Sequence, residues 1–506
     1  MAVPSVSRRR LITGFAIVLA ASATPMLQAC GPAATPTKAP DPKPAAPAAA
    51  APAPAAPATA KPAESSAAPP AKPADAAAAP AKAPAAAAPV AAGAGPIQLK
   101  YQHWATSKLY QQAVESQIDN FIKTKAPTAS VEYITATGGN EYNKKLMTLV
   151  AANTVPDVFW VSMLYGTSLY VQAKNVFVDP TDRWKRDAAE IKPEDFWLDA
   201  STMGTWKGRL FGIPRPGGAH QNYFYNTKLF QEAGVETPDK MFDAGKWNLE
   251  TLRESALKLT KRGTDGRAQQ FGLVSFLSDV NQITGVIWSH GATWFDKEFT
   301  KSTMNTPEAV AAVTYAANLV RKDKVSPQTS EGDIDWLATG KIGLQNSWIS
   351  TAAVFATYPY DWDIAPQPKG PNNKDWETVQ SGNLWIMPPT SKHNDTVWEL
   401  IKHSFSPDED QRFSQTMFQP PMRKSSLETY NAWLLGSKKF PKNVEYHKQI
   451  FERGRFMETG PEWARVDDPW KRLVAEPLQR DPNADVKTAL DKFVAEVNTM
   501  IKERPA

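Results

Sequence analysis

The pattern of apolar and polar residues becomes regular at residue 97 and stays so to the end of the chain. Ile97, Leu99 and Tyr101 alternate with polar residues, which predicts a half-buried strand ending at His103 and Trp104. After this strand, apolar residues recur at spacings of three and four, which predicts a helix with one buried face. The residues of that face are Tyr110, Val114, Ile118, Phe121 and Ile122.

Further strands and helices alternate along the chain. Tyr142, Leu146 and Leu149 predict another helix, and the apolar run over 155–161 predicts a buried strand. Three later helices have recognisable starts, because a capping side chain precedes each amphipathic stretch. These caps are Asn248, Thr306 and Ser406. Strands separated by helices indicate an α/β fold, and no internal repeat is visible.

Composition agrees with a large folded body. The chain has 506 residues, of which 42% are apolar and 22% charged, enough for two domain-sized cores. The net charge of +5 lies in residues 1–96, which hold eight basic and three acidic residues. The remainder carries 49 of each sign and is neutral. Without a basic field, nucleic acid is not expected as a partner.

The N-terminus has the features of an export signal over residues 1–29. Arginines at 8–10 precede a short apolar stretch over 11–23 and small residues before Cys30. This stretch is shorter than the roughly 20 residues that a spanning helix needs, so a removable signal peptide is expected. The paired arginines resemble a twin-arginine signal, and Leu-Gln-Ala-Cys over 27–30 resembles a lipobox, although Gln28 departs from the usual small residue.

Cys30 is the sole cysteine of the chain. It is either an unused thiol or the residue that carries a lipid, and the lipobox favours lipidation. Residues 31–96 consist mainly of Ala and Pro, which cannot bury enough apolar area to fold. We expect residues 30–96 to form a lipidated, disordered tether that extends up to the order of 200 Å at about 3.1 Å per residue. Prolines every few residues argue against a helix there.

Several segments of the body, in order, resemble the extracellular solute-binding proteins of ABC importers, in particular the maltose- and multiple-sugar-binding branch. No single segment is specific to this family, but the order and spacing of the segments together are. The segments are LMTLVAANTVPDVFW at 146–160, GRLFGIPRPGGAHQNYFYN at 208–226, LFQEAG at 229–234, KWNLETLRESALKL at 246–259, TPEA at 306–309, GKIG at 340–343 and IAPQPKGP at 364–371.

The resemblance implies a two-lobed, periplasmic-binding-protein-like α/β fold with a hinge and a ligand cleft between the lobes. Mapped onto this chain, lobe one spans 97–215 plus 346–382. Lobe two spans 221–345 plus 383–506. Ligand contacts with both lobes would stabilise the closed state. An ABC permease would then receive the solute, which implies a position at the outer face of the cytoplasmic membrane.

The resemblance also indicates stacking residues for a sugar ring. Trp160, Trp348 and Trp470 fall on positions that carry stacking aromatics in the maltose-binding branch. Large aromatic residues more often fill cores, and this remains the alternative for each. After residue 160 the maltose-binding branch has an acidic and a basic residue that hold sugar hydroxyls, whereas this chain has VSMLY over 161–165. Tyr165 is the candidate contact there, and the identity of the sugar stays open.

Polar candidates lie at strand ends and at the expected hinge crossings. His103 and Trp104 end the first strand, where open α/β sheets bind ligands. A buried, hydrogen-bonded histidine is the equal alternative for His103. The remaining candidates are His220 and Gln221 at the first crossing and Asn383 and Trp385 at the third.

Catalysis and the binding of a non-sugar solute are the alternatives to sugar capture. The sequence has six scattered histidines and no metalloprotease, nucleophile-elbow or phosphate-loop motif, so no metal and no cofactor are expected. A secreted glycosidase remains an alternative, because carboxylate pairs cannot be recognised in one sequence. The same fold binding a peptide, a polyamine or a glycerophosphodiester is the other.

Overall fold

The computed structural model describes residues 97–104, 108–136, 139–197, 200–215, 219–327, 335–371, 374–437 and 441–504. Residues from 88 onward group into one compact unit. The expected signal peptide, Cys30 and the tether lie outside the described residues.

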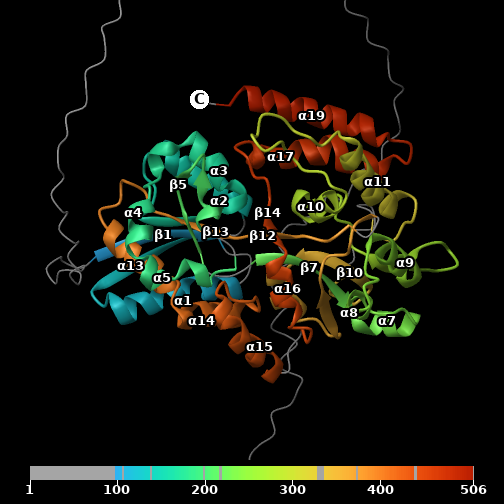
Figure 1. The fold of residues 1–506 in the computed structure, drawn as a ribbon, viewed down its shortest axis with the longest axis horizontal. Helices are drawn as coiled ribbons and strands as arrows, with labels where there is room; N and C mark the ends of the chain where they lie inside the picture. The colour runs from blue at the N-terminus through green and yellow to red at the C-terminus, as the bar shows by residue number, and fades with distance from the viewer. Residues whose placement is uncertain are drawn as a thin grey trace, which may run out of the picture. The chain divides into compact units, whose positions relative to one another are not determined.

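The first lobe is built on a five-stranded sheet (Figure 1). Its strands, in spatial order, are β2 (Ala129–Ala136), β1 (Ile97–Trp104), β3 (Val158–Ser162), β13 (Asn383–Ile386) and β6 (Ile213–Pro214). β1 runs parallel to β2 and β3, whereas β13 is antiparallel to β3 and β6. The predicted strands over 97–104 and 155–161 are therefore confirmed as β1 and β3, with β3 bounded at 158–162.

Helices pack on this sheet through the faces that the sequence predicts. α1 (Lys108–Lys125) buries Ala113, Val114, Ile118 and Phe121, while Tyr110 is only partly buried. The other helices of the first lobe include α2 (Gly139–Ala151), α3 (Met163–Gln172), α13 (Asn394–Ser404) and α14 (Pro407–Met417). α13 and α14 pack against α1, so residues far apart in the sequence close one core.

The second lobe is built on a seven-stranded sheet. The strands are β14 (Gly454–Phe456), β12 (Thr378–Ser381), β7 (Ala219–Asn226), β10 (Ile342–Trp348), β9 (Ala268–Leu273), β8 (Lys261–Arg262) and β11 (Trp362–Ala365), the last paired with β7. β7 is the organising strand because β10, β11 and β12 all pair with it in antiparallel register.

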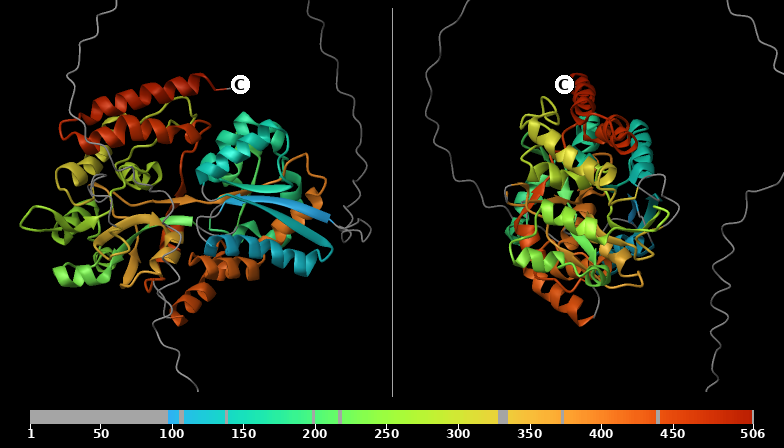
Figure 2. Two further views of the ribbon diagram at one scale, coloured as in Figure 1. Left: turned by 180° about the vertical axis from the view of Figure 1, so that it is seen from behind. Right: turned by 90° about the vertical axis from the view of Figure 1, so that its right-hand side faces the viewer.

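Helices from the middle and the end of the chain complete the second lobe. Both views of the ribbon place α17 and α19 together on one side of it (Figure 2). The principal elements are α9 (Leu249–Leu259), α10 (Val280–Ser289), α11 (Pro307–Arg321), α15 (Leu427–Gly436), α16 (Tyr446–Glu452), α17 (Trp463–Pro469), the π-helix η8 (Trp470–Ala475), α18 (Glu476–Arg480) and α19 (Val486–Lys502).

The three predicted helix caps are confirmed. The Asn248 side chain accepts a hydrogen bond from the Thr251 amide at 2.9 Å and completes a capping box at the start of α9. Thr306 and Ser406 accept from the third amide of α11 and α14. Each cap satisfies an amide that would otherwise lack a partner at a helix start.

Strand pairing divides the chain between the lobes differently from the predicted boundaries. The segment 346–382 was expected in lobe one, but β10, β11 and β12 pair with β7 in the second sheet. β13 begins at Asn383 and pairs with β3 in the first sheet, although 383 onward was expected in lobe two. The reason is that the backbone changes sheets at the single residue Gly382, and hydrogen bonding on either side of it fixes the assignment.

Between the described elements of the two lobes, the backbone crosses three times. The crossings lie between β6 and β7, at Gly382 between β12 and β13, and after α14. Met417 belongs to a first-lobe core cluster and Phe418 to a second-lobe cluster around Phe224. The first lobe is therefore 97–214 plus 383–417, and the second lobe is 219–381 plus 427–504. Residues 418–426 connect them.

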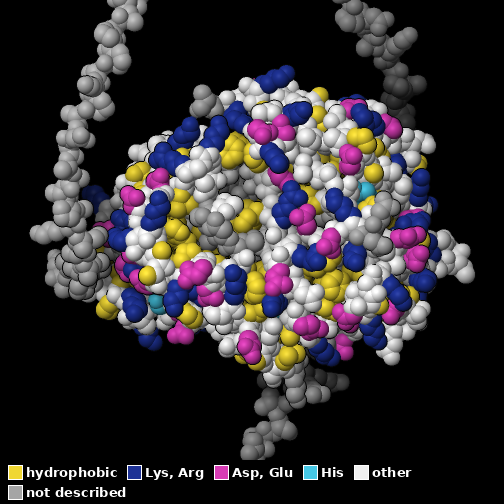
Figure 3. Space-filling model, in the orientation of Figure 1, with side chains coloured by type: hydrophobic (Ala, Val, Ile, Leu, Met, Phe, Trp, Pro, Cys, Tyr) yellow, Lys and Arg dark blue, Asp and Glu magenta, His cyan; other side chains and the backbone are white. Residues whose placement is uncertain are grey.

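The visible face of the body (Figure 3) carries charges of both signs. The face in Figure 3 shows basic and acidic side chains interspersed, in keeping with the neutral charge balance beyond residue 96. Within the described part of the chain, no helix combines the length and apolar character needed to cross a bilayer.

Candidate functional site

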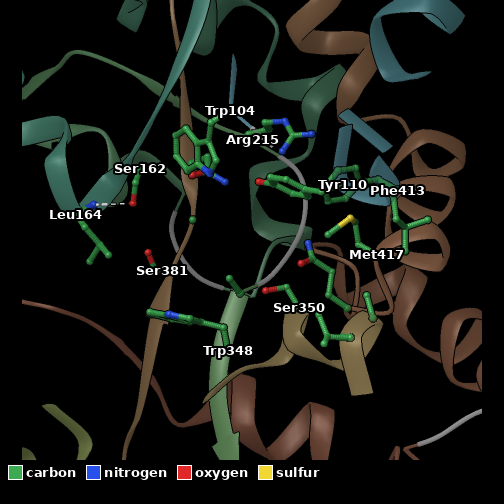
Figure 4. Close-up of a pocket in the computed structure, with 17 residues that line it drawn as sticks. Trp104, Tyr110, Ser162, Leu164, Arg215, Trp348, Ser350, Ser381, Phe413 and Met417 are labelled. Carbon is green, nitrogen blue, oxygen red and sulfur yellow. Dashed lines mark hydrogen bonds between the residues drawn. The ribbon is translucent and has the colours of Figure 1, made fainter. Parts of the chain in front are cut away.

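A cavity of about 480 Å³ is lined by residues from both lobes (Figure 4). Trp104, Ser162 and Asn383 reach it from the first sheet, at the carboxyl ends of β1 and β3 and the paired start of β13. Trp348 and Ser381 end β10 and β12 of the second sheet. The remaining lining residues are Leu109, Tyr110, Leu164, Arg215, Ala219, Ser350, Ala353, Val354, Gly382, Phe413, Met417 and Gln419. Strand ends and crossings therefore meet at one pocket.

Two tryptophans face this pocket from different lobes. In Figure 4, Trp104 stands at one side of the pocket and Trp348 at the opposite side. Both are partly exposed, so each has ring surface available to a ligand. Trp104 stacks on the fully buried Trp160, with ring centroids 3.7 Å apart and 24° between the planes.

Of the described residues that line the pocket, Arg215 alone is charged. It is 1% exposed. Its amide donates to the Asn383 carbonyl at 2.6 Å, and its Nη2 donates to the Gln117 side-chain oxygen at 2.9 Å. The guanidinium lies 4.5 Å from the Phe413 ring centroid and 5.1 Å from that of Trp160. Aromatic faces thus surround a buried cation.

Tyr110 lies beside this arginine. Burial raises the pKa of the Tyr110 hydroxyl. The positive charge of Arg215 opposes this rise, as do hydrogen bonds of the hydroxyl with Arg215 and Asn383. The phenol is therefore neutral at ordinary pH, and it joins Arg215 and Asn383 in one polar group at the wall of the pocket.

Three predicted contacts reach the pocket: Trp104, Trp348 and Asn383. Trp160 and Trp385 lie behind the lining, fully buried in the first lobe, and flank the Arg215 guanidinium. Trp160 lies in a strand that is buried on both faces, so its ring supports the lining residues and is not itself a stacking surface for a ligand.

Trp470 does not reach the pocket, which corrects its assignment as a stacking residue. Its Nε1 donates to the Leu277 carbonyl at 2.8 Å, and its ring packs edge-on against Trp294 and Phe493. A tryptophan whose polar atom is satisfied inside a core gains more from burial than it would at a wet surface. Trp470 is a core residue of the second lobe.

His103 also lies away from the lining, as the alternative interpretation for it expected. Its Nε2 is 3.1 Å from both the Glu115 carboxylate and the Thr135 hydroxyl. Burial lowers the pKa of His103, against the influence of Glu115. This histidine is held by hydrogen bonds within the first lobe.

His220, Gln221 and Tyr165 are not lining residues either. His220 packs edge-on against Phe451 with ring centroids 5.0 Å apart. Gln221 donates to the Asn281 carbonyl at 2.9 Å. Tyr165, in α3, packs against the second-lobe core, and burial raises its pKa. His220 and Gln221 are neighbours in β7, so their side chains point to opposite faces of the strand, and both faces are packed. Tyr165 points from α3 toward the core of the second lobe.

The sequence did not single out Tyr110, Arg215, Phe413 and Met417 as pocket residues. Tyr110, Phe413 and Met417 have the spacing of ordinary buried helix faces, and periodicity does not distinguish a core from a cleft between lobes. Arg215 offered a signal, because a lone arginine between two prolines in an apolar run is unusual. Among the described residues, no group of three or more potential metal ligands comes together.

The fold has many solved relatives at low sequence identity. The ABC substrate-binding protein Lmo0181 from Listeria monocytogenes is 20% identical, with a TM-score of 0.69 over 80% of this chain and 99% of that one. A cyclic alpha-maltosyl-1,6-maltose binding protein from Arthrobacter globiformis is 16% identical, with a TM-score of 0.66 over 81% and 100%. The GacH receptor of Streptomyces glaucescens is 16% identical, with a TM-score of 0.65 over 81% and 99%.

A search of curated protein sequences gives no match. At the level of sequence families, however, the family model for bacterial extracellular solute-binding proteins matches residues 103–411, which is more than half of the chain. This span includes most strands of both sheets, two of the three crossings and most of the pocket lining. The chain belongs to the bacterial extracellular solute-binding protein family.

Proposed function

We propose that this protein captures a sugar or oligosaccharide in the pocket between its lobes and delivers it to an ABC permease. The observation that carries the proposal is the pair Trp104 and Trp348, which face one cavity from different lobes. Sugars present apolar ring faces bordered by hydroxyls, and flat aromatic surfaces with nearby polar groups suit them. Ser162, Ser350, Ser381, Asn383 and Gln419 supply such groups.

The solved relatives support the carbohydrate class. The structure of Lmo0181 is a complex with cycloalternan, and that of GacH includes complexes with acarbose and a homolog. A Thermotoga maritima MalE3 structure holds maltose. A polyamine is disfavoured in this chain, because the one charged residue that lines the described pocket is a cation.

Capture would proceed by closure of the lobes. A ligand that touches Trp104 and Trp348 together binds the closed arrangement more strongly than the open one, so it shifts the population toward closure. The three crossings let the lobes rotate without breaking either sheet. The permease would recognise the closed form.

Membrane attachment through Cys30 is part of the proposal. The lipobox at 27–30 and the Ala/Pro-rich residues that follow support a lipid anchor with a long spacer. Replacement of Cys30 by alanine should release the exported protein from the membrane fraction. Retention of the variant in that fraction would contradict lipid anchoring.

A thermal-shift screen against neutral and acidic sugars tests solute capture directly. A ligand at 100 times its dissociation constant should add about 2.7 kcal/mol of stability. The same sugars should be recovered unchanged after incubation, since we propose binding without turnover. Cleavage of an oligosaccharide would favour the glycosidase alternative, and no response to any sugar would contradict the carbohydrate assignment.

A further inference from the structure

The charge of the pocket gives the starting observation. Arg215 is the only charged residue in the lining, and no carboxylate lies within 4.0 Å of its guanidinium among the described residues. A guanidinium removed from water is costly unless hydrogen bonds and an opposite charge compensate it. The protein supplies only part of that compensation.

The hydrogen bonds of Arg215 are incomplete. Nη2 donates to Gln117 at 2.9 Å, and Tyr110 bonds the same side chain. Nε is buried without a partner in the part of the chain that the structure describes. The faces of Phe413, Trp160 and Trp385 attract the cation but accept no strong hydrogen bond.

Glu115, an acidic residue of the first lobe, already has partners within the protein. Glu115 also lies on α1, but its Oε1 is 2.9 Å from the Gln111 amide and 3.1 Å from His103. The described contacts of this carboxylate are therefore with Gln111 and His103 and not with Arg215. Among the described residues, none supplies a negative charge within ion-pair distance of Arg215, which leaves that role to a ligand.

We propose that the ligand is an acidic saccharide, whose carboxylate binds Arg215 at the Tyr110 and Asn383 side of the pocket while its rings contact Trp104 and Trp348. This assignment rests on the proposed function and narrows it. The planar guanidinium matches a carboxylate in two parallel hydrogen bonds. A phosphate monoester carries about −1.5 to −2 charges, and no second cation lines the described pocket to balance it.

The test uses the full chain and ligands that differ only in charge. Titration calorimetry would compare a uronic acid trisaccharide, its methyl ester and the neutral trisaccharide of the parent sugar, in the galacturonate and glucuronate series. The acid of at least one series should bind about 10- to 100-fold more tightly than its ester, the range expected for hydrogen bonds to a charged group. A phosphorylated sugar of the same series is the second probe.

Each other outcome overturns a defined part of the assignment. Neutral sugars that bind as tightly as the acids would overturn the acidic-ligand inference and leave sugar capture intact. Tighter binding of the phosphorylated sugar would overturn the carboxylate assignment. Binding of no saccharide at all would overturn both the inference and the proposed function.

A variant built beside Arg215 gives an independent test. Gln117→Glu would place a carboxylate at the oxygen that Arg215 already contacts at 2.9 Å. This internal anion should lower affinity for the acid at least about tenfold more than affinity for the ester, because it neutralises the charge of Arg215 that the acid would otherwise meet. Arg215→Gln should abolish the preference for the acid. Should that buried variant fail to fold, Gln117→Glu and the acid-to-ester comparison decide, and an unchanged preference in Gln117→Glu would overturn the inference.

Discussion

The indole of Trp104 rests on the indole of Trp160, with ring centroids 3.7 Å apart. Trp104 borders the pocket and is partly exposed, whereas Trp160 is fully buried and also faces the Arg215 guanidinium at 5.1 Å. The two rings therefore have different roles. Trp104 is the surface that meets a ligand, and Trp160 fixes the position of Trp104 and of Arg215.

Replacement of these two residues by alanine should have different consequences. Trp104→Ala should weaken sugar binding by about 1–3 kcal/mol, as expected for a lost aromatic contact at the centre of a site. Trp160→Ala should weaken binding and also lower the free energy of unfolding by about 3–5 kcal/mol, because it leaves a cavity in the core. Calorimetric titration and denaturant unfolding measure the two quantities.

The conservative variant Trp160→Phe serves as a control for this division of roles. It retains part of the buried area and should recover most of the stability, while the smaller ring supports Trp104 less well. Full stability in Trp160→Ala would show that Trp160 is not a core support.

Trp348 should contribute to affinity from the second lobe. Trp348→Ala should weaken binding by about 1–3 kcal/mol with little loss of stability, because this ring is only partly buried. Trp433→Ala is the matched control, since Trp433 is a partly buried second-lobe tryptophan outside the pocket lining. Equal affinities of the two variants would argue against stacking at Trp348.

Trp470 should act on stability alone. Trp470→Ala removes a fully buried ring and its hydrogen bond to Leu277, so we expect a loss of about 3–5 kcal/mol in the free energy of unfolding. Trp470→Phe should be milder because it retains edge contacts with Trp294 and Phe493. If the folded Trp470→Phe protein bound sugar much more weakly than the native chain, the core assignment would fail.

The sequence was sufficient for the elements of the fold but not for how they are shared between lobes. Alternation at 97–101 and the caps at Asn248, Thr306 and Ser406 depend on near neighbours, and the structure confirms them. The division at Gly382 depends on which distant strand each neighbour pairs with. No local pattern contains that information, so β12 and β13 were assigned to the wrong lobes.

The site, like the fold, was predictable only where local sequence features determine it. Trp104, Trp348 and Asn383 lie at strand ends or a crossing, where the α/β fold places ligands. Trp470 matched a family position that carries a stacking aromatic, but its Nε1 donates to the Leu277 carbonyl inside the core of the second lobe. Arg215 was missed because its importance depends on the lack of an ion-pair partner among the described residues, and this appears only once distant residues are placed in space.

Acidification should destabilise the second lobe through two buried histidines. His220 and His447 are fully buried near each other, with ring centroids 6.1 Å apart. Burial lowers the pKa of His220 well below its usual value and that of His447 to about 3. The unfolded chain therefore takes up protons at these residues before the folded protein does. Their contribution to stability is complete above about pH 6.5 and is lost as the pH falls toward 3.

Buried carboxyls oppose this trend, so the comparison has to use a variant. Burial raises the pKa of Asp363 to about 7 and that of Asp410 to about 6, and such groups favour the folded state at lower pH. His447→Gln removes one histidine contribution and leaves both carboxyls. From pH 7 to pH 5, the native chain should lose stability relative to His447→Gln by up to about 1.4 kcal/mol per pH unit. Parallel stability curves for the two proteins in denaturant titrations would show that folding does not lower the pKa of His447.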